Sequence, residues 1–232
     1  MLLTKNKLTY NDNYIDKTVE GYIMTNLHKD LSTIIKERHS IRQYDPSFKL
    51  SKEELKSILE EATLAPSSSN MQAWSFIVVQ DDERKKDLAL YGNNAKVAEN
   101  ASAVIAVLGD TEMYQNVDKI YDMMFEAGYV DEENKQRLAQ DVKRIYPSAP
   151  LETRRNMASF DAGLASMQLM LIAKNRGLDT ITMGGFDKAA FAKNFNVDER
   201  YMPIVLIAIG KAAGDHYFKT VRLPVEDIAT FI

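Results

Sequence analysis

Two arginines, a histidine and a serine lie within one short segment of the chain: Arg38, His39, Ser40 and Arg42. Guanidinium groups match the geometry of phosphate oxygens, so this segment could bind a phosphate monoester through charge-assisted hydrogen bonds. The competing interpretation is a solvated helix C-terminus, where the helix macrodipole favours positive side chains. For an isolated Arg-x-Ser-x-Arg segment that simpler explanation is the more common one, and a lone histidine is more often structural than catalytic.

A second polar segment begins at Pro66 and runs through Trp74 into an apolar stretch. Its small side chains could hydrogen-bond the edge of a planar polar ring, and they are those of Ser67, Ser68, Asn70 and Gln72. The alternative is a loop in which Ser and Asn side chains satisfy their own backbone. Trp74 is most simply explained as a core aromatic residue.

Two weaker signals occur later in the chain. The adjacent Gly184 and Gly185 would let a backbone N–H group approach a flat ligand, or would simply allow a tight turn with positive φ. Lys219 and Arg222 place two cations ahead of Pro224, where an ordinary exposed loop is the alternative.

The composition excludes several kinds of site and partner. There is no cysteine, which excludes disulfides, thiolate nucleophiles and Cys-ligated zinc or iron–sulfur centres. The three histidines are far apart in the sequence, which disfavours a histidine metal site. A net charge of −4 without a basic block disfavours nucleic acid as the partner. No apolar run approaches the roughly 20 residues of a membrane span, and the first residues lack the apolar core of a secretory signal. We therefore expect a cytoplasmic protein with no nucleic-acid or membrane partner.

The helices that should position these residues follow from caps and periodicity. A helical pattern starts near residue 24 and includes Ile35, with Thr25 or Asn26 as its N-cap. Ser51 and Glu54 form a capping box for a second helix that ends at Pro66. Residues 112–145 predict one or two charged helices.

The longest helical pattern spans residues 151–176, with Gly177 as a natural C′ residue. Large apolar residues form one stripe along it, and small residues form a second face, so the helix should be buried on more than one side. The stripe contains Met157, Phe160, Leu164, Met167 and Leu171, and the second face contains Ala158, Ala162 and Ala165.

Apolar runs predict strands at residues 74–79, 101–108, 180–183 and 201–209. The run at 101–108 is continuous, which is typical of a strand buried on both faces. With the helices between them, and without a flexible linker, these strands predict one α+β domain. Residues 1–23 differ in composition and would be an arm on a partner subunit, or would precede an alternative start at Met24.

The order and spacing of these motifs resemble the FMN-dependent nitroreductase family over residues 27–232, with residues 1–26 as an N-terminal extension. One departure is Ala73, which stands where the family often has proline. The resemblance implies a nitroreductase-like three-layer α-β-α fold with a mainly antiparallel sheet. It also implies an intertwined homodimer with an FMN in each of two interface sites.

Carried over by motif, Arg38, Ser40 and Arg42 would hold the flavin phosphate and ring edge, supported by His39. Arg222, with Lys219, would complete the phosphate site, and Gly184 and Gly185 would lie beside flavin N5. The loop of the other subunit would contact the same flavin through Pro66, Ser67, Ser68, Asn70 and Gln72. Asn94 or Lys96 would reach the pyrimidine edge, and residues 112–146 would cover the pocket.

The function implied by the resemblance is an NAD(P)H-dependent oxidoreductase. Hydride would pass from NADPH or NADH to flavin N5 and then to a nitroaromatic, a quinone or a similar small acceptor, with ping-pong kinetics. Such chemistry is carried by the cofactor, so it needs no cysteine and no catalytic triad. The alternatives are a protein that stores or senses FMN without turnover, and a flavin-free interaction protein on the same scaffold.

Overall fold

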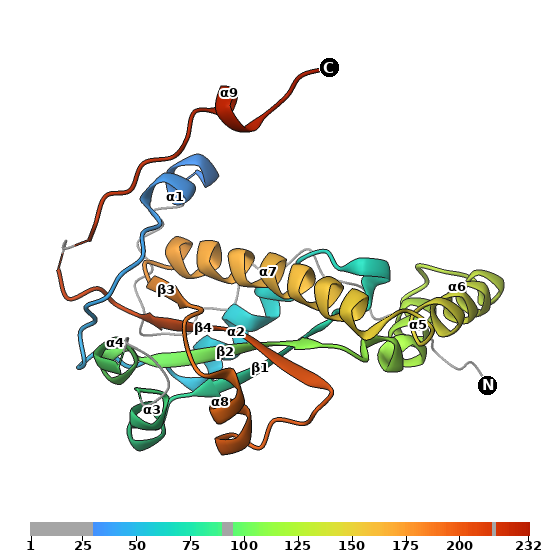
Figure 1. The fold of residues 1–232 in the computed structure, drawn as a ribbon, viewed down its shortest axis with the longest axis horizontal. Coiled ribbons are helices and arrows are strands. Elements are labelled where there is room, and N and C mark those ends of the chain that lie inside the picture. Colours follow the sequence, from blue (N-terminus) through green and yellow to red (C-terminus); the bar gives the residue numbers. More distant parts are fainter. Residues whose placement is uncertain (1–29, 90–94, 215–216) are drawn as a thin grey trace, which may run out of the picture.

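The computed structural model describes residues 30–89, 95–214 and 217–232. Its centre is a four-stranded antiparallel sheet with the strand order β1-β2-β4-β3 (Figure 1). The strands are β1 Trp74–Val79, β2 Ala103–Asp110, β3 Asp179–Met183 and β4 Tyr201–Gly210. Every residue of β2 is buried, as its continuous apolar run predicts for a central strand.

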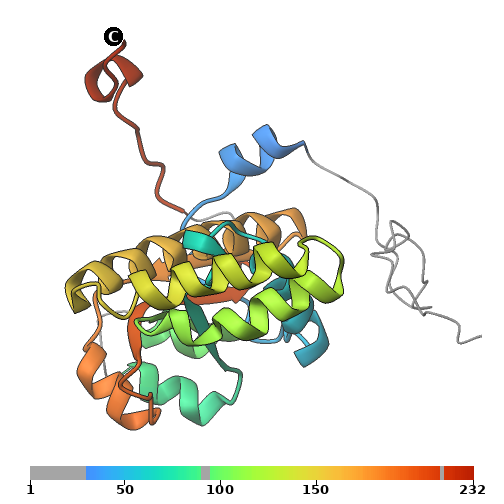
Figure 2. The same cartoon turned by 90° about the vertical axis from the view of Figure 1, so that its right-hand side faces the viewer.

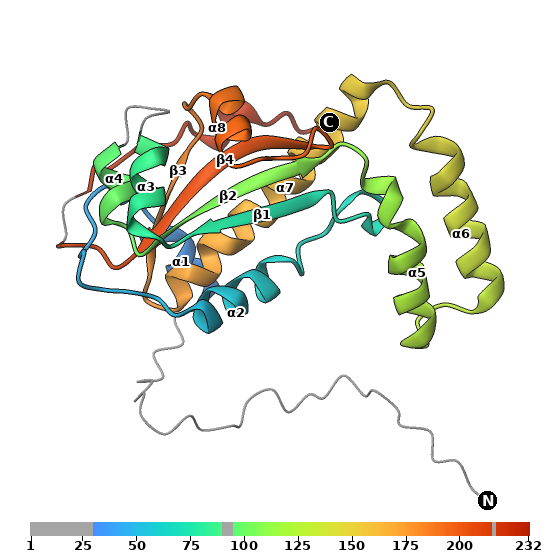
Figure 3. The ribbon, with the colours of Figure 1, turned by 90° about the horizontal axis from the view of Figure 1, so that it is seen from below.

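Helices cover both faces of this sheet (Figure 3). On one face, α2 (Lys52–Ala62) and α7 (Leu151–Asn175) pack against Ile105 and Ile207. On the other face are three short helices, namely α3 (Asp82–Ala89), α4 (Ala95–Asn100) and α8 (Lys188–Asn194). Because successive residues of β2 alternate between the two core clusters, the strand serves both layers. The predicted three-layer arrangement is confirmed.

Helices begin and end at several of the predicted capping residues. Ser51 and Glu54 form the capping box of α2, in which each side chain accepts from the other residue's backbone N–H. Gly177 has φ +72° after α7, and the N–H groups of Gly177 and Leu178 donate to the last turn of the helix. The α2 helix ends at Ala62, earlier than the predicted end at Pro66.

The first described helix, α1, spans Leu31–Glu37 and is capped by Asp30, whose carboxylate accepts from the N–H of Thr33. The predicted caps Thr25 and Asn26 lie outside the described residues, and the cap of this helix is Asp30.

The chain after α1 extends the sheet. Ser40 pairs in parallel with Thr180 on the edge strand β3, and Tyr44 pairs antiparallel with Ala212 beyond β4. This pairing fixes the arginine-bearing segment against the end of the sheet.

The α7 helix turns its small residues toward the sheet. Ala158, Ala162 and Ala165 are fully buried, whereas the side chains of Phe160 and Met167 are 67% and 39% exposed. Within a single chain, the prediction that the large apolar stripe is buried is therefore wrong for Phe160 and Met167. The exposed part forms an apolar face that its own chain leaves uncovered.

Two parts of the chain extend beyond the three layers. A helical hairpin, α5 (Val117–Glu126) and α6 (Glu132–Ile145), lies beside the N-terminal end of α7, preceded by the short helix η2 (Met113–Asn116). Residues 217–232, including α9 (Val225–Ile228), leave the body on the side of α1 (Figure 2). In the described part of the chain, no helix is long and apolar enough to cross a membrane.

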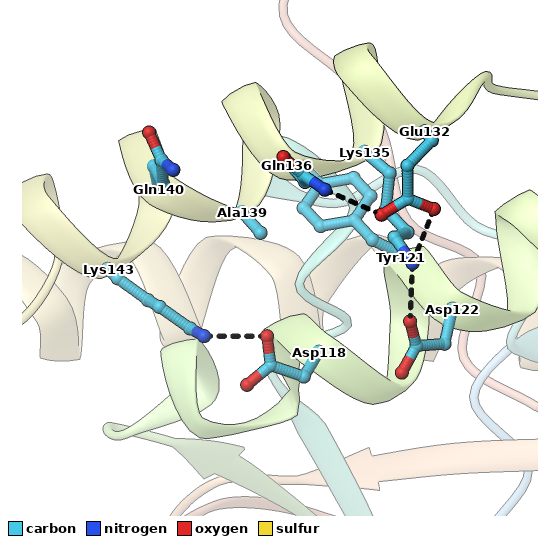
Figure 4. Close-up of a pocket in the computed structure, with 9 residues that line it drawn as sticks. All are labelled: Asp118, Tyr121, Asp122, Glu132, Lys135, Gln136, Ala139, Gln140 and Lys143. Carbon is cyan, nitrogen blue, oxygen red and sulfur yellow. Dashed lines mark hydrogen bonds and ion pairs between the residues drawn. The ribbon is translucent and has the colours of Figure 1, made fainter.

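A groove of about 310 Å³ between α5 and α6 is lined by paired charges (Figure 4). Lys135 lies 3.2 Å from Asp122, and Lys143 lies 2.7 Å from Asp118, so each pair joins one helix to the other. These side chains already neutralise one another. The two ion pairs therefore hold the hairpin together, and the groove between the helices is a poor candidate for a ligand site.

Candidate functional site

The predicted phosphate segment lies at the C-terminal end of α7. Arg38 is the C-cap residue of α1, and its N–H donates to the carbonyl of Ile34 at 3.0 Å. The chain then extends along β3, where the N–H of Ile41 donates to the carbonyl of Thr180 at 3.1 Å. The His39 ring stacks on Tyr217 with ring centroids 3.9 Å apart. Residues 38–42 and the start of the C-terminal segment are thus brought together.

Positive charge converges on His39. Its pKa lies below the usual value, first because burial penalises the charged ring, and then because Arg38, Lys174 and Arg222 repel a further positive charge. The nearby carboxylate of Asp179 opposes this shift and pairs with Lys174 at 2.9 Å. Cations from three distant parts of the sequence therefore lie near one histidine, and one of them, Lys174, is already paired with a carboxylate.

A pocket of about 450 Å³ opens at this point. It is lined by polar and charged side chains together with small residues: Lys36, Glu37, His39, Ile41, Lys174, Asp179, Ala212, Gly214 and Tyr217. The guanidinium groups of Arg42 and Arg222 are exposed and donate to nearby groups of their own segments. Lys219 is also exposed. The donor set of this end of the molecule fits a phosphate group.

The second predicted segment is a loop with an unusual backbone. Ser69, Asn70 and Gln72 have φ values of 51°, 57° and 51°, in the left-handed region, and none of them is glycine. Asparagine tolerates this region better than most residues. A non-glycine residue held there costs on the order of 1–3 kcal/mol, and such strain concentrates at ligand-binding sites. We therefore take the loop to be a candidate functional element.

Hydrogen bonds from within the chain hold this loop. The backbone N–H and hydroxyl of Ser68 both donate to the carboxylate of Asp161 on α7, at 3.2 Å. The Ser67 hydroxyl accepts from the N–H of Gln72 at 3.0 Å. The local-turn interpretation thus describes the Ser67 hydroxyl, whereas the Ser68 hydroxyl bonds a residue of α7 that is 93 positions away. Pro66 and Asn70 are exposed, and Gln72 is half-buried.

The two glycines follow β3, beyond the strand's pairing with the arginine segment. Neither Gly184 nor Gly185 has positive φ, so the tight-turn alternative does not explain them. A Cβ atom added at either would meet no other atom within 4 Å, so the space beside them is open. Gly184 is four residues after Thr180, the residue that pairs with Ser40. In an extended strand this spacing corresponds to about 13 Å between the arginine segment and the glycines.

Comparisons with known proteins agree on one family. The model of the nitroreductase family matches residues 35–211 of the chain. The chain belongs to the nitroreductase family. Its relatives include YdgI of Bacillus subtilis, which is named a putative NAD(P)H nitroreductase, with 44% identity over 86% of this chain and 96% of that protein. Another is the CLA biosynthesis enone reductase of Lactiplantibacillus plantarum, with 32% identity over 81% of this chain and 88% of the relative.

Solved structures of other members of the family have the same fold as this chain. One, from Exiguobacterium sibiricum, was crystallised in complex with FMN. It superimposes with a TM-score of 0.84 and 43% identity, covering 88% of this chain and 97% of that one. The predicted family and fold class are confirmed.

Asn94 lies outside the described residues, and the side chain of Lys96 is not described. Sequence reasoning missed Lys174, Tyr217 and Asp161. Only Asp161 gave a signal, as a lone carboxylate beside the small-residue face of a helix with an otherwise apolar core side.

We expect Asp161→Asn to stabilise the flavin-free nitroreductase at neutral pH. Burial raises the pKa of the Asp161 carboxyl, although hydrogen bonds from Ser68 favour its charged form. Compared with the unfolded chain, the folded state therefore favours the protonated carboxyl. The contribution of this group to folding stability is greatest below the unfolded pKa of about 3.9. That contribution is lost as pH rises through the folded-state pKa.

Asparagine does not ionise, so the melting temperature of the variant should exceed that of the wild type at pH 7. The difference should shrink toward pH 4. Circular dichroism melts between pH 4 and pH 8 measure it, and a variant less stable at every pH would contradict the assignment.

Proposed function

We propose that this nitroreductase binds FMN and transfers hydride from NAD(P)H, through the flavin, to a small organic acceptor. The observation that carries the proposal is the meeting of the segment around His39, Lys174 of α7 and the C-terminal segment at one pocket, where the His39 ring stacks on Tyr217. The strained polar loop and the open glycine pair supply groups suited to a flat polar ring. The FMN held by the related structure from Exiguobacterium sibiricum supports the same cofactor.

Different residues would bind different parts of the cofactor. Arg38, Arg42 and Arg222 would bind the phosphate, with Ser40, His39 and Lys219 supporting them, because guanidinium groups form paired hydrogen bonds with phosphate oxygens. Asn70 and Gln72 would hydrogen-bond the polar edge of the ring. Gly184 and Gly185 leave room for the ring to approach the backbone. When bound, the flavin supplies the two-electron chemistry that the side chains lack.

The acceptor belongs to a class that an exposed reduced ring face could reach, such as nitroaromatics and quinones. The name of the Lactiplantibacillus plantarum relative adds enones to this class. Storage or sensing of FMN without turnover is the second candidate, since the same contacts would bind the cofactor in either case. A cytoplasmic location stays a prediction.

A visible absorption spectrum, followed by anaerobic addition of NADH or NADPH, tests the proposal. An oxidised-flavin spectrum that bleaches, and recovers when a quinone or a nitroaromatic is added, is the expected result. Bound flavin that does not bleach would support storage or sensing. Purified protein that takes up no FMN would rule out both functions.

The positions of the two binding elements support a homodimer. The phosphate segment lies near Lys174 and the loop lies near Asp161, about 20 Å apart along α7. In FMN the phosphate and the polar ring edge belong to one small molecule, yet none of the residues that line the pocket beside His39 comes from the loop of the same chain. We infer that each site combines the phosphate segment of one subunit with the loop of its partner.

The apolar surface of the single chain supports the same inference. Phe218, Val221 and Phe231 of the C-terminal segment are 81%, 93% and 88% exposed. Leu31 of α1 and Phe160 of α7 are 62% and 67% exposed. Large apolar side chains left exposed together in this way often mark a protein interface. A second copy of the chain, related by a two-fold axis near α7, would cover it.

We expect Phe160→Asp to convert the dimer to monomer, because the charge would be placed on both sides of a two-fold interface. Sedimentation should give twice 26.3 kDa for the wild type and 26.3 kDa for the variant. Tyr129→Asp, at a position 65% exposed in the α5–α6 turn, is the matched control and should remain dimeric. A monomeric wild type would refute the shared site.

A further inference from the structure

The loop of residues 67–72 is held between α7 and the α5–α6 hairpin. Left-handed backbone at Ser69, Asn70 and Gln72 is unfavourable without glycine. It persists only where surrounding contacts fix it. The contacts that fix this loop come from α7 on one side and from the α5–α6 hairpin on the other.

On the α7 side, Asp161 is completely buried. Its carboxylate accepts both the backbone N–H and the hydroxyl of Ser68 at 3.2 Å. These bonds fix the residue immediately before the first left-handed position. Asn70, two residues later, is exposed.

On the hairpin side, two tyrosines reach Ser69. The Tyr146 hydroxyl donates to the Ser69 hydroxyl at 2.8 Å, and the Tyr121 hydroxyl donates to the Ser69 carbonyl at 3.4 Å. Met71 is fully buried in an apolar cluster with residues of η2, α5 and α6, including Met113. The loop is therefore anchored by polar contacts at Ser69 and by apolar packing two residues later.

The hairpin is itself a unit. The pairs Lys135–Asp122 and Lys143–Asp118 cross from α6 to α5 (Figure 4), and Tyr121 lies between them in the same groove. Because these contacts fix α5 relative to α6, they also fix the direction from which both tyrosines reach Ser69.

We propose that Tyr146 and Asp161 are positioning residues for the flavin-binding loop. They act through Ser69 and Ser68 to hold the left-handed turn that presents Asn70 and Gln72 to the ring. The inference rests on the proposed function, because it requires the loop to contact FMN. It also gives the α5–α6 hairpin, predicted only to cover the pocket, a second role in cofactor affinity.

The first test removes one hydroxyl. Tyr146→Phe should weaken FMN binding about three- to tenfold, the effect of losing one hydrogen bond at a neutral pair. Flavin fluorescence titration of the full-length apoprotein measures the dissociation constant. Tyr129→Phe, in the exposed turn of the same hairpin, is the matched control and should bind FMN as the wild type does.

A double-mutant cycle distinguishes positioning from general loss of structure. If Tyr146 acts through the Ser69 hydroxyl, then Ser69→Ala and the double variant should each weaken FMN binding as much as Tyr146→Phe alone. Additive effects would overturn the inference. On the α7 side, Asp161→Ala should weaken binding tenfold or more, and Asp161→Asn, which keeps an acceptor oxygen, should weaken it less.

The outcomes separate this inference from the function on which it rests. Wild-type protein that binds FMN, with Tyr146→Phe binding equally well, would overturn the positioning role and leave the proposed function intact. Wild-type protein that binds no FMN would overturn the proposed function and the positioning role together.

Discussion

Replacing Arg38 and Arg42 together with alanine is expected to weaken FMN binding at least tenfold. Each guanidinium would otherwise donate charge-assisted hydrogen bonds to the phosphate, worth about 1.5–3 kcal/mol each. Neither arginine is part of a core cluster, so the fold should persist. Titration of the apoprotein with FMN, at one fixed ionic strength, gives the change in dissociation constant.

The matched control removes the same charge elsewhere. Arg137 and Arg144 on α6 are 61% and 72% exposed and pair with Asp141 at the surface. The double alanine variant at these positions should bind FMN as the wild type does, because it changes net charge without touching the pocket. If the Arg38/Arg42 variant also binds FMN normally, the phosphate assignment is wrong.

Arg200→Ala is expected to destabilise the fold by about 3–5 kcal/mol, the cost of leaving a buried carboxylate without its partner. Arg200 donates through Nε and Nη2 to both carboxylate oxygens of Asp110, whose side chain is only 1% exposed. It also donates to Gln115 at 2.9 Å and Asn116 at 3.1 Å. These bonds tie the start of β4 to the end of β2 and to η2. Urea unfolding of the flavin-free protein measures the loss.

Two further variants test whether the unpaired Asp110 carboxylate causes this loss of stability. Arg200→Met combined with Asp110→Asn should recover much of the lost stability, because no buried charge is then left unpaired. Arg137→Ala breaks an exposed pair at 4.0 Å and should change stability by less than about 1 kcal/mol. Equal losses in the Arg200→Ala single variant and the double variant would show that packing, rather than the carboxylate, sets the cost.

Features set by local sequence could be predicted. The capping box at Ser51, the C′ glycine Gly177 and the apolar run of β2 depend on neighbouring residues, and the structure has all three where expected. The family resemblance likewise depended on motifs and their order. It implied the fold that the comparisons confirm, whereas the roles that it implies for the arginine segment and the loop stay predictions.

Features set by distant contacts could not be predicted. Asp161 and Ser68 are 93 positions apart, and Tyr146 and Ser69 are 77 apart, so no local pattern joins them. The exposure of Phe160 was mispredicted for a related reason. Periodicity marks a side chain as apolar but does not say whether its own chain or another covers it.

The proposed site, which combines the arginine segment of one subunit with the loop of its partner, predicts how damaged copies would behave in one cell. In a mixed dimer, a chain lacking Arg38 and Arg42 could still lend its intact loop to a partner whose own loop is damaged. One of the two sites would then carry both lesions, and the other would carry neither. Two such recessive alleles should therefore complement each other, whereas two alleles damaged in the same element should not.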